Sequence, residues 1–247
     1  MKSTVSIPRS HMVIACRGGD RTAIEERSLQ PPQAGELLLK VRVVGLCGTD
    51  LFKLDSGTLV PGTVLGHELV GEVVSVGAGV TAFGNGDRVA VPHHVACGKC
   101  ALCLRGAVTM CEVFKENLLA PGGFAEHVVV RERATAHAAR RLPDGLADEV
   151  AVFMEPAACV LRGIHHAGVA PDGVAVVQGG GAMGLLHLLV LAGLRPKLRI
   201  LVIDPIEKRR DLARELGADA AAIPGEDAHE ALMEMSDGLG ADAVFDT

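Results

Sequence analysis

The sequence predicts an α/β protein in which a compact β domain is followed by a doubly wound parallel sheet. Three observations support this prediction. Short Val-rich segments separated by turn signals fill the first half, strands alternate with helices from residue 173 onward, and a glycine-rich loop opens the first of those helices. The pattern changes near residues 143–156, so we expect one domain over residues 1–156 and a second over residues 157–247.

Four segments of the first half are predicted strands because they are short, rich in Val and bounded by Gly, Pro or Asp. They are residues 36–44, 69–76, 88–91 and 125–130. Turn signals between them are dense, as at Pro61-Gly62 and in residues 121–123. This pattern is typical of a barrel-like β domain that carries long loops.

The second half alternates between predicted strands and helices. The expected strands are residues 174–178, 199–203, 220–223 and 243–246, and the expected helices are 182–194, 207–216 and 226–236, with an earlier helix from about residue 155. Such alternation predicts a doubly wound parallel sheet. A complete dinucleotide-binding sheet has six strands in the order 3-2-1-4-5-6, so we expect this sheet to be truncated after its fourth strand.

Composition excludes several classes of function. The net charge of −6 and the pI near 5.9 leave no basic surface for nucleic acid. The longest apolar run, residues 185–194, is interrupted by His187 and is too short to span a bilayer. The first residues lack the apolar segment of a signal peptide. We therefore expect a cytoplasmic protein that binds neither nucleic acid nor membrane.

Four cysteines give the most specific metal signal in the sequence. They follow the spacing C-x2-C-x2-C-x7-C, at Cys97, Cys100, Cys103 and Cys111. Four thiolates at this spacing can surround one ion in the closed tetrahedral arrangement of a structural zinc site. The alternatives are packed thiols or two disulfides, and a reducing compartment disfavours disulfides. We expect structural zinc here.

A glycine loop predicts dinucleotide binding. The segment GGGAMG begins at Gly179, matches G-x-G-x-x-G, follows a predicted strand and opens a predicted helix. Gly179 would permit the tight turn, Gly181 would let the backbone approach a pyrophosphate, and Gly184 would allow close helix–strand packing. The helix N-terminus would then attract the phosphates.

The residue that ends the next strand, Asp204, favours NAD. A carboxylate there can accept hydrogen bonds from the ribose hydroxyls and would repel a 2′-phosphate. Lys208 and Arg209 weaken the predicted preference for NAD over NADP, since either could approach a phosphate or face water. The alternative role for Asp204 is a helix N-cap before Pro205.

A second candidate metal site combines Cys47, His67 and Glu68, with Glu155 as a further carboxylate. A Cys, a His and a carboxylate with one open position are the ligands of a catalytic zinc. A lone His or a lone buried Cys is more often a packing residue, but here they occur together before a dinucleotide loop. The chain has no Tyr to donate a proton, and a metal is the obvious alternative stabiliser of an oxyanion.

These motifs together resemble the zinc-dependent medium-chain alcohol dehydrogenases, in the branch of sorbitol, threonine and related polyol dehydrogenases. GHELVGEVVSVGAGV at residues 66–80 matches that family's zinc signature, and CGTD at 47–50, GDRV at 86–89, GGFAEHV at 122–128 and EPAACVLRG at 155–163 follow the family's order. The resemblance implies a GroES-like domain carrying both zincs, a Rossmann domain that binds NAD, and an active site in the cleft between them.

The resemblance also implies residue roles. Cys47, His67 and Glu68 would hold the catalytic zinc, and Glu155 would bind the metal directly or through its water, so that the two glutamates could exchange roles. Asp50 resembles the carboxylate that orients the His ligand. Thr49 would bind the substrate oxygen and pass on its proton.

One position departs from the family pattern. Phe52 stands where many relatives have the His that completes the proton relay, so the relay must end elsewhere. His93 falls where relatives line the substrate pocket and could act as a base, although a plain polar loop residue is the commoner case. His94 and the pair His165-His166 have no assigned role.

The sequence therefore predicts an oxidoreductase with two zinc ions per chain that transfers hydride between NAD and a secondary alcohol of a polyol, sugar or amino-alcohol. The alternative is a truncated, inactive remnant that binds zinc, with or without NAD. A zinc-free quinone-reductase relative is disfavoured because both ligand sets are present. The expected partner is a small-molecule alcohol. A homo-oligomer is expected of the complete family fold, and that expectation weakens for a truncated chain.

Overall fold

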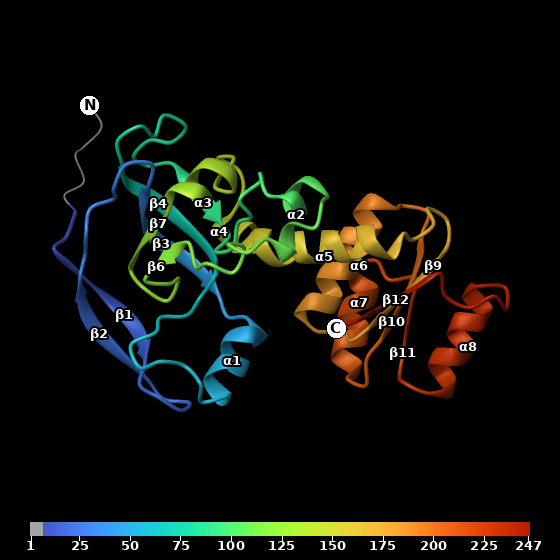
Figure 1. Ribbon diagram of the computed structural model, residues 1–247. Coiled ribbons are helices and arrows are strands. Elements are labelled where there is room, and N and C mark those ends of the chain that lie inside the picture. The colour runs from blue at the N-terminus through green and yellow to red at the C-terminus, as the bar shows by residue number, and fades with distance from the viewer. Residues whose placement is uncertain (1–6) are drawn as a thin grey trace. The chain divides into compact units, whose positions relative to one another are not determined.

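The computed structural model describes residues 7–247. The chain divides into two compact units, residues 1–155 and residues 156–247 (Figure 1). Each unit has its own hydrophobic core. The core of the first unit is centred on residues such as Leu37, Leu39 and Val128, and that of the second on residues such as Leu188 and Ile200.

An antiparallel sheet forms the centre of the first unit. Its strands are β3 (Leu37–Gly45), β4 (Glu68–Val76), β5 (Arg88–Val91), β6 (Leu119–Ala120), β7 (His127–Val130) and β8 (Arg140–Arg141). Their order within the described residues is β6-β7-β3-β4-β5-β8. The four strands expected from the Val-rich pattern are confirmed, with ends that differ by up to two residues. Two register shifts between β3 and β4 mark bulges, which bend and twist a sheet and so curl it.

A separate ribbon is formed by β1 (Ser10–Cys16) and β2 (Thr22–Ser28), which pair antiparallel. Isolated bridges from Val13 to Ala125 and from Ala15 to Val64 join this ribbon to the rest of the unit. The Val-rich pattern does not mark these strands because one face lies in water, where Ile24 is 69% exposed.

Short helices in the first unit carry several of the candidate residues. They are α1 (Gly48–Asp55), α2 (Ala101–Leu104), α3 (Glu132–His137) and α4 (Asp148–Ala151), with a 3-10 turn at Val108–Met110. Helix α5 (Met154–Ala167) begins at the end of the first unit and continues into the second.

The second unit alternates strands and helices as expected. Its elements are β9 (Val174–Gln178), α6 (Ala182–Leu194), β10 (Arg199–Ile203), α7 (Glu207–Glu215), β11 (Ala220–Ala222), α8 (Glu226–Met235) and β12 (Ala243–Asp246). The strands pair parallel in the order β11-β10-β9-β12. This order is the 3-2-1-4 portion of a dinucleotide-binding sheet, which confirms the predicted fold class.

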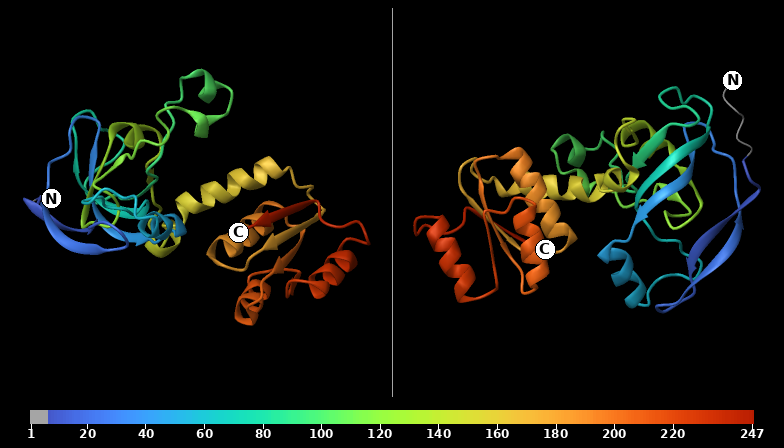
Figure 2. Two further views of the ribbon diagram at one scale, coloured as in Figure 1. Left: turned by 60° about the horizontal axis from the view of Figure 1, so that its bottom comes forward. Right: turned by 180° about the vertical axis from the view of Figure 1, so that it is seen from behind.

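Helices cover both faces of the parallel sheet. Figure 1 and the right-hand view of Figure 2 show α6 and α7 on one side of the strands and α8 on the other. Burial on two faces explains why β9 is a continuous apolar run, with Val174–Val177 all buried. Although α6 is also apolar, no helix within residues 7–247 is long and apolar enough to cross a bilayer.

Candidate metal centres and dinucleotide loop

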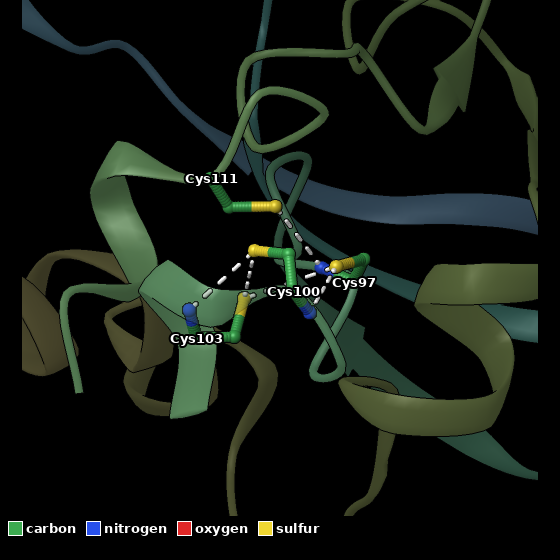
Figure 3. A group of neighbouring side chains, drawn as sticks. All are labelled: Cys97, Cys100, Cys103 and Cys111. Carbon is green, nitrogen blue, oxygen red and sulfur yellow. Dashed lines mark hydrogen bonds between the residues drawn. The ribbon is translucent and has the colours of Figure 1, made fainter. Parts of the chain in front are cut away.

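The four cysteines of the predicted structural site converge on one centre (Figure 3). The Sγ atoms of Cys97, Cys100, Cys103 and Cys111 all lie within 4.8 Å of one another. The Sγ atoms of Cys100 and Cys103 are 3.5 Å apart, too far for a disulfide bond, whose sulfurs lie about 2 Å apart. The described cysteines are all free, so the disulfide alternative is wrong.

Backbone N–H groups donate to these sulfurs. The amide of Cys100 donates to the Sγ of Cys97 at 3.4 Å, and the amide of Cys97 donates to the Sγ of Cys111 at 3.5 Å. The N–H groups of Lys99 and Cys100 lower the pKa of the Cys97 thiol to about 6. The loop therefore favours the thiolate at Cys97, which is the form that binds a metal, whereas burial and the neighbouring Cys100 raise the pKa of the Cys103 thiol to about 11.

The second cluster brings together Cys47, His67 and Glu68, whose ligand atoms also lie within 4.8 Å of one another. Pairing of β3 with β4 sets Gly45 opposite Glu68, so the chain that leads to Cys47 starts beside the first residue of β4. A Cβ at Gly45 would fall 2.3 Å from the Oε2 atom of Glu68, so a side chain there would displace that carboxylate from its present position. Gly66 holds φ +88° where a Cβ would meet the backbone of Phe124 at 2.8 Å. The zinc signature begins at Gly66, whereas no sequence motif singled out Gly45, and the need for glycine at both positions depends on tertiary contacts.

Asp50 is fully buried behind this cluster. Its Oδ1 atom lies 3.3 Å from Nδ1 of His67 and accepts the N–H of Gly66 at 3.4 Å, and its Oδ2 atom accepts the N–H of Cys47 at 3.2 Å. Burial opposes ionisation, but these partners, His67 first among them, hold the pKa of Asp50 below its usual range. The hydrogen bond to Asp50 raises the pKa of His67 to about 9 against the effect of burial, and Cys47 adds to the rise. Below that pKa both ring nitrogens carry a proton, so a metal at Nε2 would have to displace one proton while the carboxylate of Asp50 retains the other on Nδ1.

The imidazole rings of His67, His93 and His94 lie side by side at the cluster. In the sequence, only His93 and His94 are neighbours. The ring centres of His67 and His93 are 4.6 Å apart, and those of His93 and His94 are 3.5 Å apart. Burial, with added repulsion from His94, lowers the pKa of His93 to about 3, so its ring is neutral. The Nδ1 atom of His93 is buried and has no hydrogen-bond partner.

The glycine loop between β9 and α6 has the local geometry of a phosphate-binding turn. Gly179 holds φ +104°, and a Cβ at Gly184 would fall 1.7 Å from the carbonyl oxygen of Gly179. A Cβ at Gly181 would meet nothing within 4 Å, so the space above that backbone is open. Gly181 is also the N-cap of α6, and no side chain there occupies the free N–H groups of the first turn. Those amides can face an anion.

Asp204 lies beside this loop and is 1% exposed. Its carboxylate accepts the backbone N–H groups of Gly180 and Ile206, both at 2.7 Å. Burial would raise its pKa, but these two bonds and the Arg209 guanidinium 3.4 Å away lower it. The carboxylate therefore anchors the glycine loop, a role that the sequence did not reveal. Helix α7 uses Ile206 as its N-cap residue, so Asp204 is not the helix cap considered above.

Comparisons with known proteins give the family. Residues 33–143 match the alcohol dehydrogenase GroES-like domain. The sorbitol dehydrogenase of Halalkalibacterium halodurans is 33% identical over 233 residues, which cover 93% of this chain and 67% of that protein. The chain belongs to the zinc-type medium-chain alcohol dehydrogenases. It spans between 59% and 67% of the length of the first curated relatives that it matches.

Solved structures of other dehydrogenases agree with the fold. The structure of the alcohol dehydrogenase rspB from E. coli CFT073, complexed with NADH, has a TM-score of 0.84 and 31% identity, over 97% of this chain and 70% of that one. A zinc-binding dehydrogenase from Sinorhizobium meliloti, bound to NADP, has a TM-score of 0.80 and 27% identity, over 96% of this chain and 69% of that one. Both forms of the nicotinamide cofactor therefore occur among similar proteins.

Four further candidate residues are Thr49, Phe52, Glu155 and Lys208. Thr49 is exposed in the first turn of α1, and its N–H donates to the Sγ of Cys47 at 3.4 Å. Phe52 is 73% exposed on the same helix. Glu155 stands in the first turn of α5 and is not part of the cluster found among the described residues. Lys208 is exposed in α7.

Donor chemistry fits zinc at both clusters of this medium-chain dehydrogenase. Four thiol sulfurs form a closed soft set, whereas one sulfur, one imidazole and one carboxylate form a mixed set that leaves a coordination position open. The open space above Gly181 and the free amides of α6 likewise fit a dinucleotide pyrophosphate.

Proposed function

We propose that this chain acts as a zinc- and NAD-dependent dehydrogenase of a secondary alcohol on a polyol, sugar or amino-alcohol. The convergence of Cys47, His67 and Glu68, with Asp50 buried behind the imidazole, is the observation that carries the proposal. The similarity to a sorbitol dehydrogenase supports the substrate class. A homo-oligomer and a cytoplasmic location remain predictions from the sequence.

Two zinc ions would bind in the first unit. Cys47, His67 and Glu68 would hold the catalytic ion, with Glu155 as the alternative or additional carboxylate, and the four cysteines would hold the structural ion. The catalytic zinc would supply a Lewis acid that lowers the pKa of the alcohol and polarises the carbonyl.

The chain's own residues would perform the remaining steps. Asp50 keeps the proton on Nδ1 of His67, so that the imidazole binds through Nε2 as a neutral ligand. The exposed hydroxyl of Thr49 would accept the proton of the substrate alcohol while it passes its own proton to solvent, since Phe52 cannot relay it. NAD, when bound, would supply the acceptor for the hydride that the carbinol carbon loses as it becomes a carbonyl carbon.

The second unit would bind the cofactor. The free amides at the start of α6 and the open backbone at Gly181 would receive the pyrophosphate. Asp204 would accept a ribose hydroxyl and thereby favour NAD over NADP, although its carboxylate also serves the loop and pairs with Arg209.

Metal analysis combined with turnover tests the proposal. We expect two zinc ions per purified chain and NAD-dependent oxidation of at least one polyol. Cys47→Ser should leave one zinc and abolish turnover with little loss of NAD affinity, because Cys47 lies in the zinc cluster and not in the glycine loop. Cys16 is a buried thiol outside both clusters, so Cys16→Ala should keep two zincs and full turnover.

Two outcomes would contradict the proposal in different ways. Turnover that survives in Cys47→Ser with two zincs bound would show that this cluster is not the catalytic site. A wild-type chain that binds two zincs and NAD but oxidises no polyol would favour the alternative of an inactive zinc-binding protein.

A further inference from the structure

A cavity of about 210 Å³ adjoins the second cluster within the first unit. It shares Asp50 and His67 with that cluster. The other polar side chains that line it come from α1, from the loop before β4, from the segment before the four-cysteine lobe and from the loop after it. They are Lys53, Thr63, His93, His94, Lys115 and Asn117. Substrate atoms beside His67 would therefore extend into this space.

The charges facing the cavity do not balance. Lys53 and Lys115 each contribute an ammonium group, and neither forms an ion pair within the part of the chain that the structure describes. Asp50 is the one carboxylate among the described lining residues, and its oxygens are already held by His67 and two backbone amides. Lys53 is half-buried and Lys115 is exposed, so the cavity carries two positive charges that no carboxylate among its described lining residues neutralises.

The histidines of the cavity respond to these charges. Burial is the main cause that lowers the pKa values of His93 and His94, and the positive charge of Lys53 contributes to both. Lys115 contributes to the lowered pKa of His94 as well. The neutral rings can offer hydrogen bonds, and Nδ1 of His93 has no partner of its own.

We propose that this cavity selects alcohols that carry an anionic group, a phosphate or a carboxylate, which pairs with Lys53 and Lys115 while the hydroxyl lies at the zinc cluster. Lysine binds phosphate as a point charge, and charge-assisted hydrogen bonds are about twice as strong as neutral ones. A neutral polyol would form no charge-assisted bond with either ammonium group, so it should bind more weakly than an anionic alcohol. The inference rests on the proposed catalytic role of the neighbouring cluster.

Binding to the full zinc-loaded chain tests this inference with three ligands of equal carbon number: glycerol, glycerate and glycerol 3-phosphate. Calorimetry should show that at least one of the two anions binds about tenfold or more tightly than glycerol. The comparison of glycerate with glycerol 3-phosphate then distinguishes a carboxylate site from a phosphate site. Equal binding of all three ligands would overturn the inference.

Charge variants make the test specific. Lys53→Gln and Lys115→Gln should each weaken binding of the preferred anion about tenfold without changing glycerol binding, and Lys115→Arg should retain most of the affinity. Lys197→Gln, an exposed lysine in the second unit, is the matched control and should change nothing. Anion affinity that is insensitive to both glutamine variants would also overturn the inference.

The readout separates this inference from the proposed function because binding needs no hydride transfer. If wild type holds two zincs and oxidises neutral polyols but shows no anion preference, the inference fails and the proposed function stands. If Cys47→Ser loses one zinc and still binds the anion through the two lysines, the cavity is confirmed independently of catalysis.

Discussion

Asp50 positions two members of the cluster formed by Cys47, His67 and Glu68. It is fully buried, closes the N-terminus of α1 through the N–H of Cys47, and also holds His67 and the N–H of Gly66. One carboxylate therefore positions two of the three candidate ligands. A change at Asp50 should therefore reduce zinc affinity more than it reduces the stability of the fold.

We predict that Asp50→Asn weakens zinc binding at the catalytic cluster about 10- to 100-fold, the usual effect of removing a partner that orients a metal ligand. Competition with a chromophoric chelator measures this affinity. The structural zinc should remain bound, because its four cysteines lie elsewhere in the chain. Asp55→Asn, at the exposed end of the same helix, is the control. Equal zinc affinity in Asp50→Asn and wild type would show that Asp50 does not orient His67.

At the scale of elements, the turn from β9 into α6 depends on the absence of a side chain at one position. We predict that Gly184→Ala disrupts this turn, since its Cβ would fall 1.7 Å from the carbonyl oxygen of Gly179. NAD affinity should fall by more than tenfold, about 1.4 kcal/mol, and the Tm of the second unit should fall. Fluorescence titration with NADH and calorimetric melting measure the two effects.

Gly193 lies on the same helix and gives a matched control. A Cβ there would meet nothing within 4 Å, so Gly193→Ala should leave NAD binding unchanged. It should stabilise the helix by about 0.4–1 kcal/mol, because alanine has less conformational freedom to lose on folding. If both variants bind NADH like wild type, close packing at Gly184 is not required for the site.

A buried carboxylate joins α4 to the sheet of the first unit. Asp148 accepts hydrogen bonds from Arg42 of β3 at 2.5 Å and from Arg88 of β5 at 2.8 Å. Burial alone would raise the pKa of Asp148, but the two guanidinium groups lower it below its usual 3.8. A depressed pKa in the folded state means that this carboxylate stabilises the fold above pH 3.8, and that the contribution is lost as pH falls through the lower folded value.

We therefore predict that Asp148→Asn lowers the free energy of unfolding by about 1–2 kcal/mol at neutral pH, and that its difference from wild type shrinks in acid. Urea unfolding at a series of pH values measures this dependence. Glu149→Gln, the exposed neighbour on α4, should behave as wild type throughout. If the difference in stability between Asp148→Asn and wild type stays constant as the pH falls, the charge of Asp148 does not stabilise the fold.

At the scale of the whole molecule, both metal clusters belong to the unit of residues 1–155, and the glycine loop belongs to the unit of residues 156–247. The two units have separate hydrophobic cores. Because a metal that binds only the folded state stabilises it, zinc should support the first unit directly.

We predict that removing zinc with a chelator exposes the backbone amides of residues 97–111 to rapid hydrogen exchange, while the amides of β9 and β10 keep most of their protection. Exchange followed by mass spectrometry resolves the two regions. Restoring zinc should restore protection in the four-cysteine lobe. Equal loss of protection in both units would show that zinc holds the molecule together as one cooperative body.

Local spacing explains why the second unit and the four-cysteine lobe could be predicted closely. The three glycines and the apolar run before them belong to one strand–turn–helix, and four cysteines within fifteen positions can reach one ion without help from distant segments. The ribbon of β1 and β2 was not predicted, because its exposed face lacks the Val-rich pattern.

The sequence by itself determined the class of fold and the types of ligand available to zinc, because these follow from periodicity and residue chemistry. The glycine loop added the prediction of a dinucleotide-binding sheet, whose first four strands have the order 3-2-1-4. Only the tertiary structure decided which residues meet. Pairing of β3 with β4 brings Cys47 to His67 and Glu68, and the fold turns Asp204 into an anchor of the glycine loop. It also places two lysines without acidic partners around one cavity. These contacts join segments far apart in the chain, and no local pattern specifies them.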